Sequence, residues 1–600
     1  MDAPPAKTDA QRSPLRGSGD GLGLAVMLVT LVAVGFAVAR YKIELTRDIR
    51  FIGHSDRAAY VEMGRSLANG DGLSVRYISY FFIPYSRDIV RREDHWPPFM
   101  AFMIAPWFKV FGVNPWAARL APILIGSIAL PVTAGLLGYV YSGRSYVGLA
   151  SGLLILTNLS IFDESLSTMS DVPLAMLVAA FCAAVIAGRD RPYLHLFAGL
   201  FAAAVYLAKG SFLWLIPSLP VIIAMACRWK ALRRRCTYLS VVVAALAIAP
   251  YLISNSYSYG SPFHSTQRYV SGYFGLADWS KATYKPYWGR DLPRTSDRWT
   301  KDPEAYARLV RSNQEQLTRY ALFGSRPEHP DPVSMLCSVS AIVFLGVLLF
   351  KSVWQWLRSK LCRMRQTSMV EGDDGSIQTG LPMLGPTMMM LAVLLVHWLF
   401  IVFLWVALPR FALVFVPITI VIGCTGMSRL MEWPMFWFAP GLRKWSSGIT
   451  VMLAVFAVTV AAVNREGIKQ YHREHSRMDQ FPYRDQPFYP AVGDYLRERL
   501  PNAVVMANNP WDFMFYSSSG NKAVKTPQAK PADLFSIARY YRVTHYLADE
   551  DRPGMRLYTR GWLPGLKRVR DAPAPLYELD YSSLPDSGLT GTSFAEAVSK

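Results

Sequence analysis

Stretches of about 20 apolar residues recur along the chain, and they constrain its fold more than any other feature. A helix needs about 20 residues to cross the hydrocarbon core of a bilayer. Eleven candidate spans occupy residues 21–39, 117–140, 145–162, 171–188, 193–208, 211–227, 237–255, 333–352, 384–406, 411–428 and 446–463. The first follows a polar tail without a small-residue cleavage site, so we expect an anchor and not a removable signal peptide. The pattern predicts an α-helical polytopic membrane protein.

The predicted orientation of the chain in the membrane depends on how residues 97–113 are interpreted. They are apolar but short, and they contain three prolines and Lys109. If they lie in the interface or re-enter, the basic cluster at 228–235 faces the cytoplasm, and the short outer turns hold only Lys209 and Arg410. A single extra crossing would move most of the basic charge outside, against the positive-inside rule. We therefore expect eleven to thirteen spans with a cytoplasmic N-terminus.

Three polar segments then face the outer side: residues 42–96, 256–331 and 464–600. They explain a mean hydropathy of only +0.19 in a chain with 52% hydrophobic residues. Residues 1–20 are expected to be a cytoplasmic tail and 21–463 a transmembrane domain. In 464–600 the pattern predicts a small extracytoplasmic α/β domain, with helices over 488–500 and 532–541 and strands over 503–508, 544–549 and 575–580.

The net charge of +20 belongs largely to the expected inner loops, so it does not indicate a nucleic-acid partner. All six cysteines lie in spans or on the inner side, which leaves none for a disulfide in the outer segments. A transporter or flippase would show internal repeats and charges in mid-span. Here the charges gather on one face, and the Trp-, Tyr- and Phe-rich outer segments are interpreted as an ordinary aromatic belt.

Ionisable residues near the bilayer are functional candidates by default, and in this chain they cluster on the outer side. The first outer segment contains Asp56, Tyr60, Gly70 and Gly72, and it closes with His95-Trp96-Pro97-Pro98. Further motifs are Phe111-Gly112 with Arg119-Leu120, the acidic turn with Asp163, Glu164 and Asp171-Val172-Pro173, Lys209-Gly210, and Arg410-Phe411.

In this order, the motifs resemble those of the GT-C superfamily of polyprenyl-phosphate-sugar glycosyltransferases. That superfamily includes the lipid A aminoarabinose transferase, the protein O-mannosyltransferases and the galacturonosyltransferases of rhizobial lipopolysaccharide. The resemblance covers roughly residues 20–430. One position departs from the pattern: relatives place His or Lys directly before Pro-Pro, whereas Trp96 here separates His95 from Pro97.

The resemblance implies a GT-C fold and inverting transfer of a sugar from a polyprenyl-phosphate donor to an acceptor hydroxyl. It implies that Asp56 is the general base, with Asp163, Glu164 and Asp171 as supporting acids. Cations stabilise the departing phosphate; the candidates are His95, Arg119, Lys209 and Arg410. Tyr60 and His264 are candidate donor or acceptor contacts. Because these fixed cations can replace a metal ion, we expect no metal and no cofactor.

Seven of the ten candidates also have a simpler structural interpretation. Asp56 or Asp171 can cap the helix that follows it. The remaining alternatives are a solvated turn for Asp163 and Glu164, a snorkelling side chain for Lys209, an interfacial anchor for Arg410 and a turn cap for His264.

The acceptor implied by the resemblance is lipid A or another envelope glycan. The reaction is then placed at the outer face of the bacterial inner membrane, with the C-terminal domain in the periplasm and membrane lipids as further partners. A protein acceptor, as in the protein O-mannosyltransferases, is the alternative. The residues do not identify the sugar or the polyprenyl length.

Overall fold

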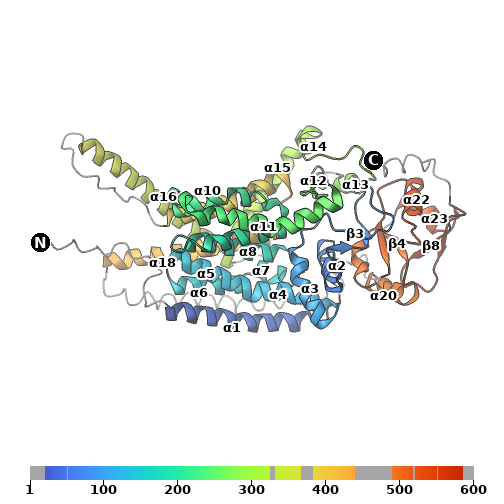
Figure 1. Cartoon of the computed structure of the whole chain (residues 1–600), viewed down its shortest axis with the longest axis horizontal. Coiled ribbons are helices and arrows are strands. Elements are labelled where there is room, and N and C mark those ends of the chain that lie inside the picture. The colour runs from blue at the N-terminus through green and yellow to red at the C-terminus, as the bar shows by residue number, and fades with distance from the viewer. Residues whose placement is uncertain are drawn as a thin grey trace.

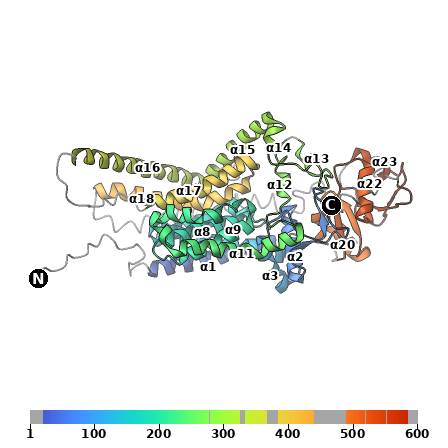
Figure 2. The same ribbon diagram turned by 45° about the horizontal axis from the view of Figure 1, so that its top comes forward.

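The computed structural model describes residues 21–50, 52–53, 55–276, 278–324, 332–366, 383–438, 489–517, 520–549 and 552–584. Long helices run side by side along the longest axis, and the strands gather at one end of this bundle (Figure 1). Short helices lie between the bundle and the sheet (Figure 2); they are α12 (Gln267–Val270), α13 (Trp279–Thr283) and α14 (Asp297–Thr300).

The bundle confirms a polytopic helical membrane protein. Within the described ranges, six helical segments are long and apolar enough to cross a membrane: Gly21–Thr46, Pro115–Ser142, Arg235–Tyr259, Ser334–Trp354, Leu384–Leu404 and Pro409–Arg429. These segments lie within α1 (Gly21–Thr46), α4 (Pro115–Leu124), η3 (Ile125–Ala129), α5 (Leu130–Ser142), α11 (Arg235–Tyr259), α16 (Pro332–Gln366), α17 (Leu384–Leu399), η6 (Phe400–Leu404), η7 (Pro409–Val414) and α18 (Phe415–Phe438).

Four more apolar helices of the bundle are shorter than a full crossing: α6 (Ser145–Thr157), α8 (Asp171–Ala187), α9 (Leu194–Ala208) and α10 (Leu215–Cys227). Helix α8 is the most enclosed, with 14 of its 17 residues buried. The expected span 145–162 is broken, because the side chain of Asn158 accepts the N–H of Ile161 and starts a new helix, α7 (Leu159–Glu164). The expected span 446–463 lies outside the described residues, so the number of spans stays a prediction.

The ambiguous apolar segment forms α3 (Phe99–Phe111), a helix of 13 residues that is too short to cross a bilayer. It packs against α2 (Asp56–Asn69) on one side and α4 on the other. Phe102, Val110 and Phe111 remain exposed along it. This arrangement agrees with a helix that lies at the end of the bundle and does not traverse it.

The C-terminal strands form a mixed six-stranded sheet in the order β2-β5-β4-β6-β8-β7. The predicted elements are confirmed as α20 (Tyr489–Arg499), β4 (Val504–Ala507), α22 (Pro531–Tyr540), β6 (His545–Leu547) and β8 (Leu576–Leu579). Strands β5 (Lys522–Lys525) and β7 (Leu566–Arg568) did not stand out from the sequence pattern, because they are short and carry lysine and arginine.

An edge strand of this sheet comes from the first outer segment. Strand β2 (Tyr77–Ile78) runs parallel to β5, with Tyr77 opposite Ala523 and Ile78 opposite Val524. The hydrophobic core is shared as well, since Tyr60 and Ile104 belong to the same buried cluster as C-terminal residues such as Val505. The outer segment and the C-terminal region are therefore one folded unit in the described structure.

Candidate functional site

A cavity lies where the ends of several bundle helices nearest the sheet (Figure 1) meet residues of the segment 42–96. Its polar lining includes Ser55, Asp56, Tyr60, His95, Ser170, Asp171, Lys209, Ser211, Gln267 and Arg410, and its aromatic lining includes Tyr80, Trp96, Phe274, Trp279, Tyr284, Phe400, Trp405 and Phe411. Six of the ten candidate residues from the sequence thus line a single cavity. Segments from opposite parts of the chain contribute to it.

Two carboxylates, Asp56 and Asp171, and two side-chain cations, Lys209 and Arg410, form the charged centre of the cavity. Arg410 Nη2 lies 2.8 Å from Asp56 Oδ2, and Arg410 Nε lies 3.9 Å from Asp171 Oδ2. Lys209 Nζ lies 3.0 Å from Asp171 Oδ1. Asp171 is therefore shared by both cations, whereas Asp56 contacts only Arg410 among the ion pairs of the described residues. The pKa of Lys209 is lowered by burial, and the attraction of Asp171 opposes that shift.

Helix ends place these four side chains. Asp56 is the first residue of α2 and Asp171 the first of α8, positions at which the helix dipole favours a negative charge. Neither acts as a side-chain cap: the cap positions are Ser55 and Ser170, without side-chain cap bonds. Lys209 follows α9 in an extended conformation, directly before the short helix η4 (Gly210–Phe212).

Tyr60 and His95 form the wall beside this centre. The hydroxyl of Tyr60 lies 3.1 Å from Ser170 Oγ. His95 stacks on Tyr80 at 4.6 Å between ring centroids, and its Nδ1 lies 3.0 Å from Thr266 Oγ1. Burial lowers the pKa of His95 to about 4, which favours the neutral imidazole at neutral pH.

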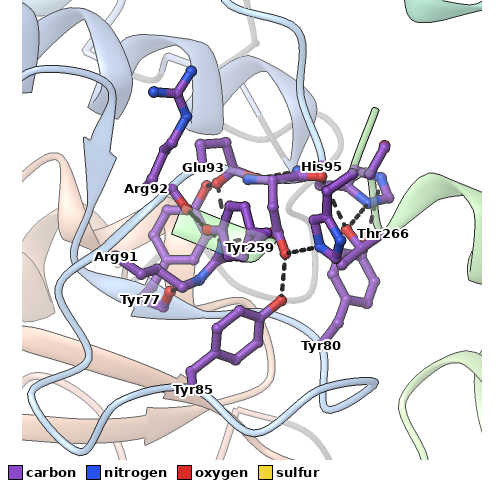
Figure 3. A network of polar contacts seen from close by, with 12 residues as sticks. Tyr77, Tyr80, Tyr85, Arg91, Arg92, Glu93, His95, Tyr259 and Thr266 are labelled. Atoms are coloured by element: carbon purple, nitrogen blue, oxygen red, sulfur yellow. Dashed lines mark hydrogen bonds and ion pairs between the residues drawn. The ribbon is translucent and has the colours of Figure 1, made fainter. Parts of the chain in front are cut away.

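A buried ionic network supports the loop that carries His95 (Figure 3). Glu93 Oε1 accepts the backbone N–H of His95 at 2.8 Å, and Tyr77 donates its hydroxyl proton to Glu93 Oε2 at 3.1 Å. Arg91 Nη1 donates to Asp94 Oδ1 at 2.6 Å. Burial raises the pKa of Asp94, but Arg91 and the surrounding hydrogen bonds outweigh it and hold the pKa at about 2.

His264 belongs to this network and to a second cavity. Its Nε2 lies 3.4 Å from Asp94 Oδ2, and its ring stacks on Tyr259 at 4.5 Å. The second cavity adjoins the first and shares six lining residues with it: His95, Pro97, Ser211, Gln267, Phe400 and Trp405. Arg268, which the sequence did not single out, also lines the second cavity.

The remaining three candidates lie outside both cavity linings. Arg119 donates through Nη1 to the carbonyl of Ile49 at 2.6 Å, so it holds the backbone that follows α1. Asp163 and Glu164 are half-buried at the end of α7. Burial raises the pKa of Glu164, and the positive charge of Arg57 opposes that shift.

Several lining residues were not predicted as site residues. Tyr80, Trp279 and Tyr284 come from the aromatic-rich outer segments, which the sequence analysis interprets as a membrane belt, and Trp405 comes from the end of the expected span 384–406; all four line the cavity. Single aromatic residues carry no sequence signal that separates a belt from a cavity wall. Among the described residues, no group of three or more His, Cys, Asp or Glu side chains is arranged to hold a metal ion.

Comparisons with known proteins agree with this architecture. The family model described as dolichyl-phosphate-mannose-protein mannosyltransferase matches residues 95–253. The matched range contains His95, Asp171 and Lys209, whereas Asp56 and Arg410 lie outside it. No curated protein sequence gives a significant match.

Solved structures match over nearly the whole chain. ArnT from Cupriavidus metallidurans, in the apo state, has a TM-score of 0.53 at 14% identity, over 94% of this chain and 99% of that chain. The same protein bound to undecaprenyl phosphate has a TM-score of 0.52 at the same identity and coverage. The apo oligosaccharyltransferase from Archaeoglobus fulgidus has a TM-score of 0.50 at 11% identity, over 87% of this chain and 69% of that chain. The expected resemblance to the GT-C superfamily, and its fold, are confirmed.

Proposed function

We propose that this GT-C-fold membrane protein is an inverting glycosyltransferase that moves a sugar from a polyprenyl-phosphate donor to an acceptor hydroxyl. The reaction takes place on the outer face of the bacterial inner membrane, with the N-terminus in the cytoplasm. The observation that carries the proposal is the cavity in which Asp56 is paired with Arg410 and Asp171 is paired with Lys209. A carboxylate and fixed cations around one cavity meet the two demands of such a transfer.

The carboxylate accepts the proton of the acceptor hydroxyl. The hydroxyl oxygen attacks the anomeric carbon, its proton passes to Asp56, and the bond between that carbon and the phosphate oxygen breaks. The lipid phosphate leaves with the electron pair of that bond. One displacement inverts the anomeric centre and needs no covalent intermediate.

The cations stabilise the leaving phosphate. In the structure Arg410 is paired with Asp56 at 2.8 Å, so an incoming phosphate competes with Asp56 for the same guanidinium. Donor binding then releases the Asp56 carboxylate to act on the acceptor. Asp171 holds Lys209 at 3.0 Å and keeps its ammonium group inside the cavity.

The names of the similar proteins support the donor class. ArnT has been solved with undecaprenyl phosphate, and the matching family model is named for transfer from dolichyl phosphate mannose. We favour lipid A or another envelope glycan as the acceptor, because the sequence motifs resemble those of the lipid A aminoarabinose transferase and its relatives. A protein hydroxyl is the second candidate, favoured by the match of residues 95–253 to a protein mannosyltransferase family.

We also propose that the transfer does not need a metal ion. Asp56 and Asp171 already face side-chain cations, which take the place that a divalent ion would occupy between carboxylate and phosphate. Transfer is expected to proceed at an unchanged rate in EDTA. A loss of activity in EDTA that Mg²⁺ or Mn²⁺ restores would contradict metal independence.

The reaction is tested by mass spectrometry of lipid A, envelope glycans and glycoproteins from cells that contain or lack the gene. A mass increment that disappears without the gene identifies the sugar and the acceptor together. Complementation with the wild type is expected to restore it and Asp56→Asn to leave it absent. Asp71→Asn, at an exposed turn of the same outer segment, is the matched control and is expected to restore it. Restoration by Asp56→Asn would contradict the assignment.

A further inference from the structure

The backbone that leads into Asp56 adopts a conformation that its residues do not favour. Ser55 has φ 53° and ψ −106°, a region that residues with a side chain rarely occupy. Gly53, two residues earlier, has φ 105°. Glycine adopts a positive φ readily, but the conformation of Ser55 raises the free energy of the chain and persists only where the surroundings impose it. The position of Asp56 is therefore fixed by contacts from outside its own segment.

One of these contacts comes from the C-terminal part of the chain. The N–H of Ser55 donates to Asp512 Oδ1 at 3.2 Å, across 457 residues of sequence. Asp512 lies in α21 (Pro510–Met514) and is 1% exposed. A buried carboxylate thus holds the backbone N–H of the residue immediately before the proposed base.

A second contact from the same region holds the chain slightly upstream. The Tyr516 hydroxyl donates to the carbonyl of Arg50 at 2.9 Å and accepts the N–H of Ile52 at 3.2 Å. One phenol therefore bridges two backbone groups on the path from α1 to Asp56. Tyr516 is 7% exposed, so water does not readily replace these bonds.

Helix α21 is itself rigidly placed. Phe513 and Met514 are fully buried in the core that the C-terminal region shares with α2 and α3. Arg65 of α2 donates to the carbonyl of Phe515 at 3.2 Å, which ties the far side of the Asp56 helix to the same segment. The C-terminal unit therefore contacts the chain both before Asp56 and after it in the sequence.

We propose that Asp512 and Tyr516 are positioning residues, which set the place of the Asp56 carboxylate by holding the backbone of Ser55 and of Arg50 and Ile52. The C-terminal region then influences the reaction through the position of Asp56. This inference rests on the proposed function, in which Asp56 is the base.

The experiment uses the full chain in lipid nanodiscs. Asp512→Ala removes the acceptor of the Ser55 N–H, whereas Asp512→Asn keeps an acceptor oxygen at the same place. Tyr516→Phe removes only the bridging hydroxyl. Asp494→Ala is the matched control, because Asp494 is a partly exposed carboxylate of the same region whose ion pair, among the described residues, is with Arg497.

Hydrogen exchange of the backbone amides reports the positioning without reference to activity. We expect Asp512→Ala to accelerate exchange at Ser55, and Tyr516→Phe to accelerate it at Ile52, by about tenfold or more, while Asp512→Asn and Asp494→Ala resemble the wild type. If Asp512→Ala does not fold, Tyr516→Phe still tests the positioning through the contacts with Arg50 and Ile52. Wild-type exchange at Ile52 and Ser55 in the variants that lose these bonds would overturn the inference.

Kinetics separate positioning from substrate binding. Undecaprenyl phosphate is expected to bind Asp512→Ala with a Kd within about twofold of the wild type, because Lys209 and Arg410 are unchanged. The transfer rate is expected to fall on the order of a hundredfold, as for a catalytic group displaced by about 1 Å, and Asp512→Asn should restore most of it. Full transfer by Asp512→Ala, with Asp56→Asn inactive, would overturn the positioning role alone. Full transfer by Asp56→Asn would instead contradict the proposed function.

Discussion

The guanidinium of Arg410 lies 2.8 Å from the carboxylate of Asp56, although 354 residues separate them in the chain. Arg410 is the second residue of η7 and Asp56 is the first residue of α2, so this ion pair joins two distant parts of the sequence at the cavity. Asp171 lies on the other side of the same guanidinium, 3.9 Å from Nε. One arginine thus holds two acids near the place where the donor phosphate is proposed to bind.

Replacing Lys209 by alanine is expected to weaken the binding of undecaprenyl phosphate about tenfold. A hydrogen bond to a charged group contributes about 1.5–3 kcal/mol, and about 1.4 kcal/mol corresponds to a factor of ten in Kd. The measurement is a binding titration in nanodiscs. Lys281→Ala, a largely exposed lysine of the second outer segment, is the control and should bind like the wild type. An unchanged Kd for Lys209→Ala would remove Lys209 from the phosphate site.

Replacing Arg91 by methionine is expected to destabilise the outer region severely. Arg91 neutralises the buried Asp94 at 2.6 Å and lies 3.7 Å from Glu93. Loss of one member of a buried ion pair leaves an uncompensated charge and typically costs about 3–5 kcal/mol. The thermal unfolding midpoint measures the effect. Arg87→Met, an exposed arginine of the same segment, should change it little; equal midpoints for both variants would show that Arg91 does not neutralise the network.

The sequence predicted the elements whose pattern is local. Apolar runs located the bundle helices, and periodicity located α20, α22 and three strands of the C-terminal sheet. Family motifs selected Asp56, Asp171, Lys209 and Arg410, which the fold brings into one cavity. The motifs could not predict which carboxylate pairs with which cation, because this depends on how distant helix ends meet in the fold.

Long-range relationships were missed for the same reason. Strand β2 has two residues and pairs with a strand more than 400 residues away, so no local period marks it. The hydrogen bond between Ser55 and Asp512 also cannot be predicted from the sequence, because one partner is a backbone N–H that every residue except proline carries. Arg119 matched a family motif, yet it bonds to the Ile49 carbonyl and lies outside the cavity lining.

Asp549 is expected to make the stability of the C-terminal unit depend on pH. Burial raises the pKa of Asp549 to about 6, although it accepts bonds from Tyr489 and from the N–H of Asn508. The unfolded chain releases this proton near pH 4. Between about pH 4 and 6 the folded state therefore binds more protons, so the free energy of unfolding decreases as pH rises through that window.

Asp549→Asn removes this dependence and keeps an acceptor for Asn508. Relative to this variant, the wild type should be on the order of 2–3 kcal/mol less stable at pH 7.5 than at pH 4.5. The comparison is made on unfolding midpoints across the pH range. Asp571→Asn, an exposed carboxylate of the same region, should track the wild type. A constant difference between wild type and Asp549→Asn would show that Asp549 does not titrate in this window.

Gly53→Ala is expected to impair both stability and transfer, and Gly70→Ala stability alone. Both glycines have positive φ, 105° and 91°, so either alanine is strained by about 1–3 kcal/mol. They differ in what surrounds them: a Cβ on Gly53 would lie 2.2 Å from Arg57 Cδ and 2.7 Å from Arg57 Cβ, whereas a Cβ on Gly70 meets nothing within 4 Å. Arg57 directly follows Asp56, so the clash at Gly53 displaces the base.

The pair of variants separates backbone strain from displacement of the base. Unfolding midpoints should fall in both Gly53→Ala and Gly70→Ala, because both lose the conformational freedom of glycine at a positive φ, and further in Gly53→Ala because of the clash with Arg57. The transfer rate should fall about tenfold or more only in Gly53→Ala, since a displacement well below 1 Å already affects a catalytic group. Equal transfer rates in the two variants would mean that the clash between Gly53 and Arg57 does not displace Asp56.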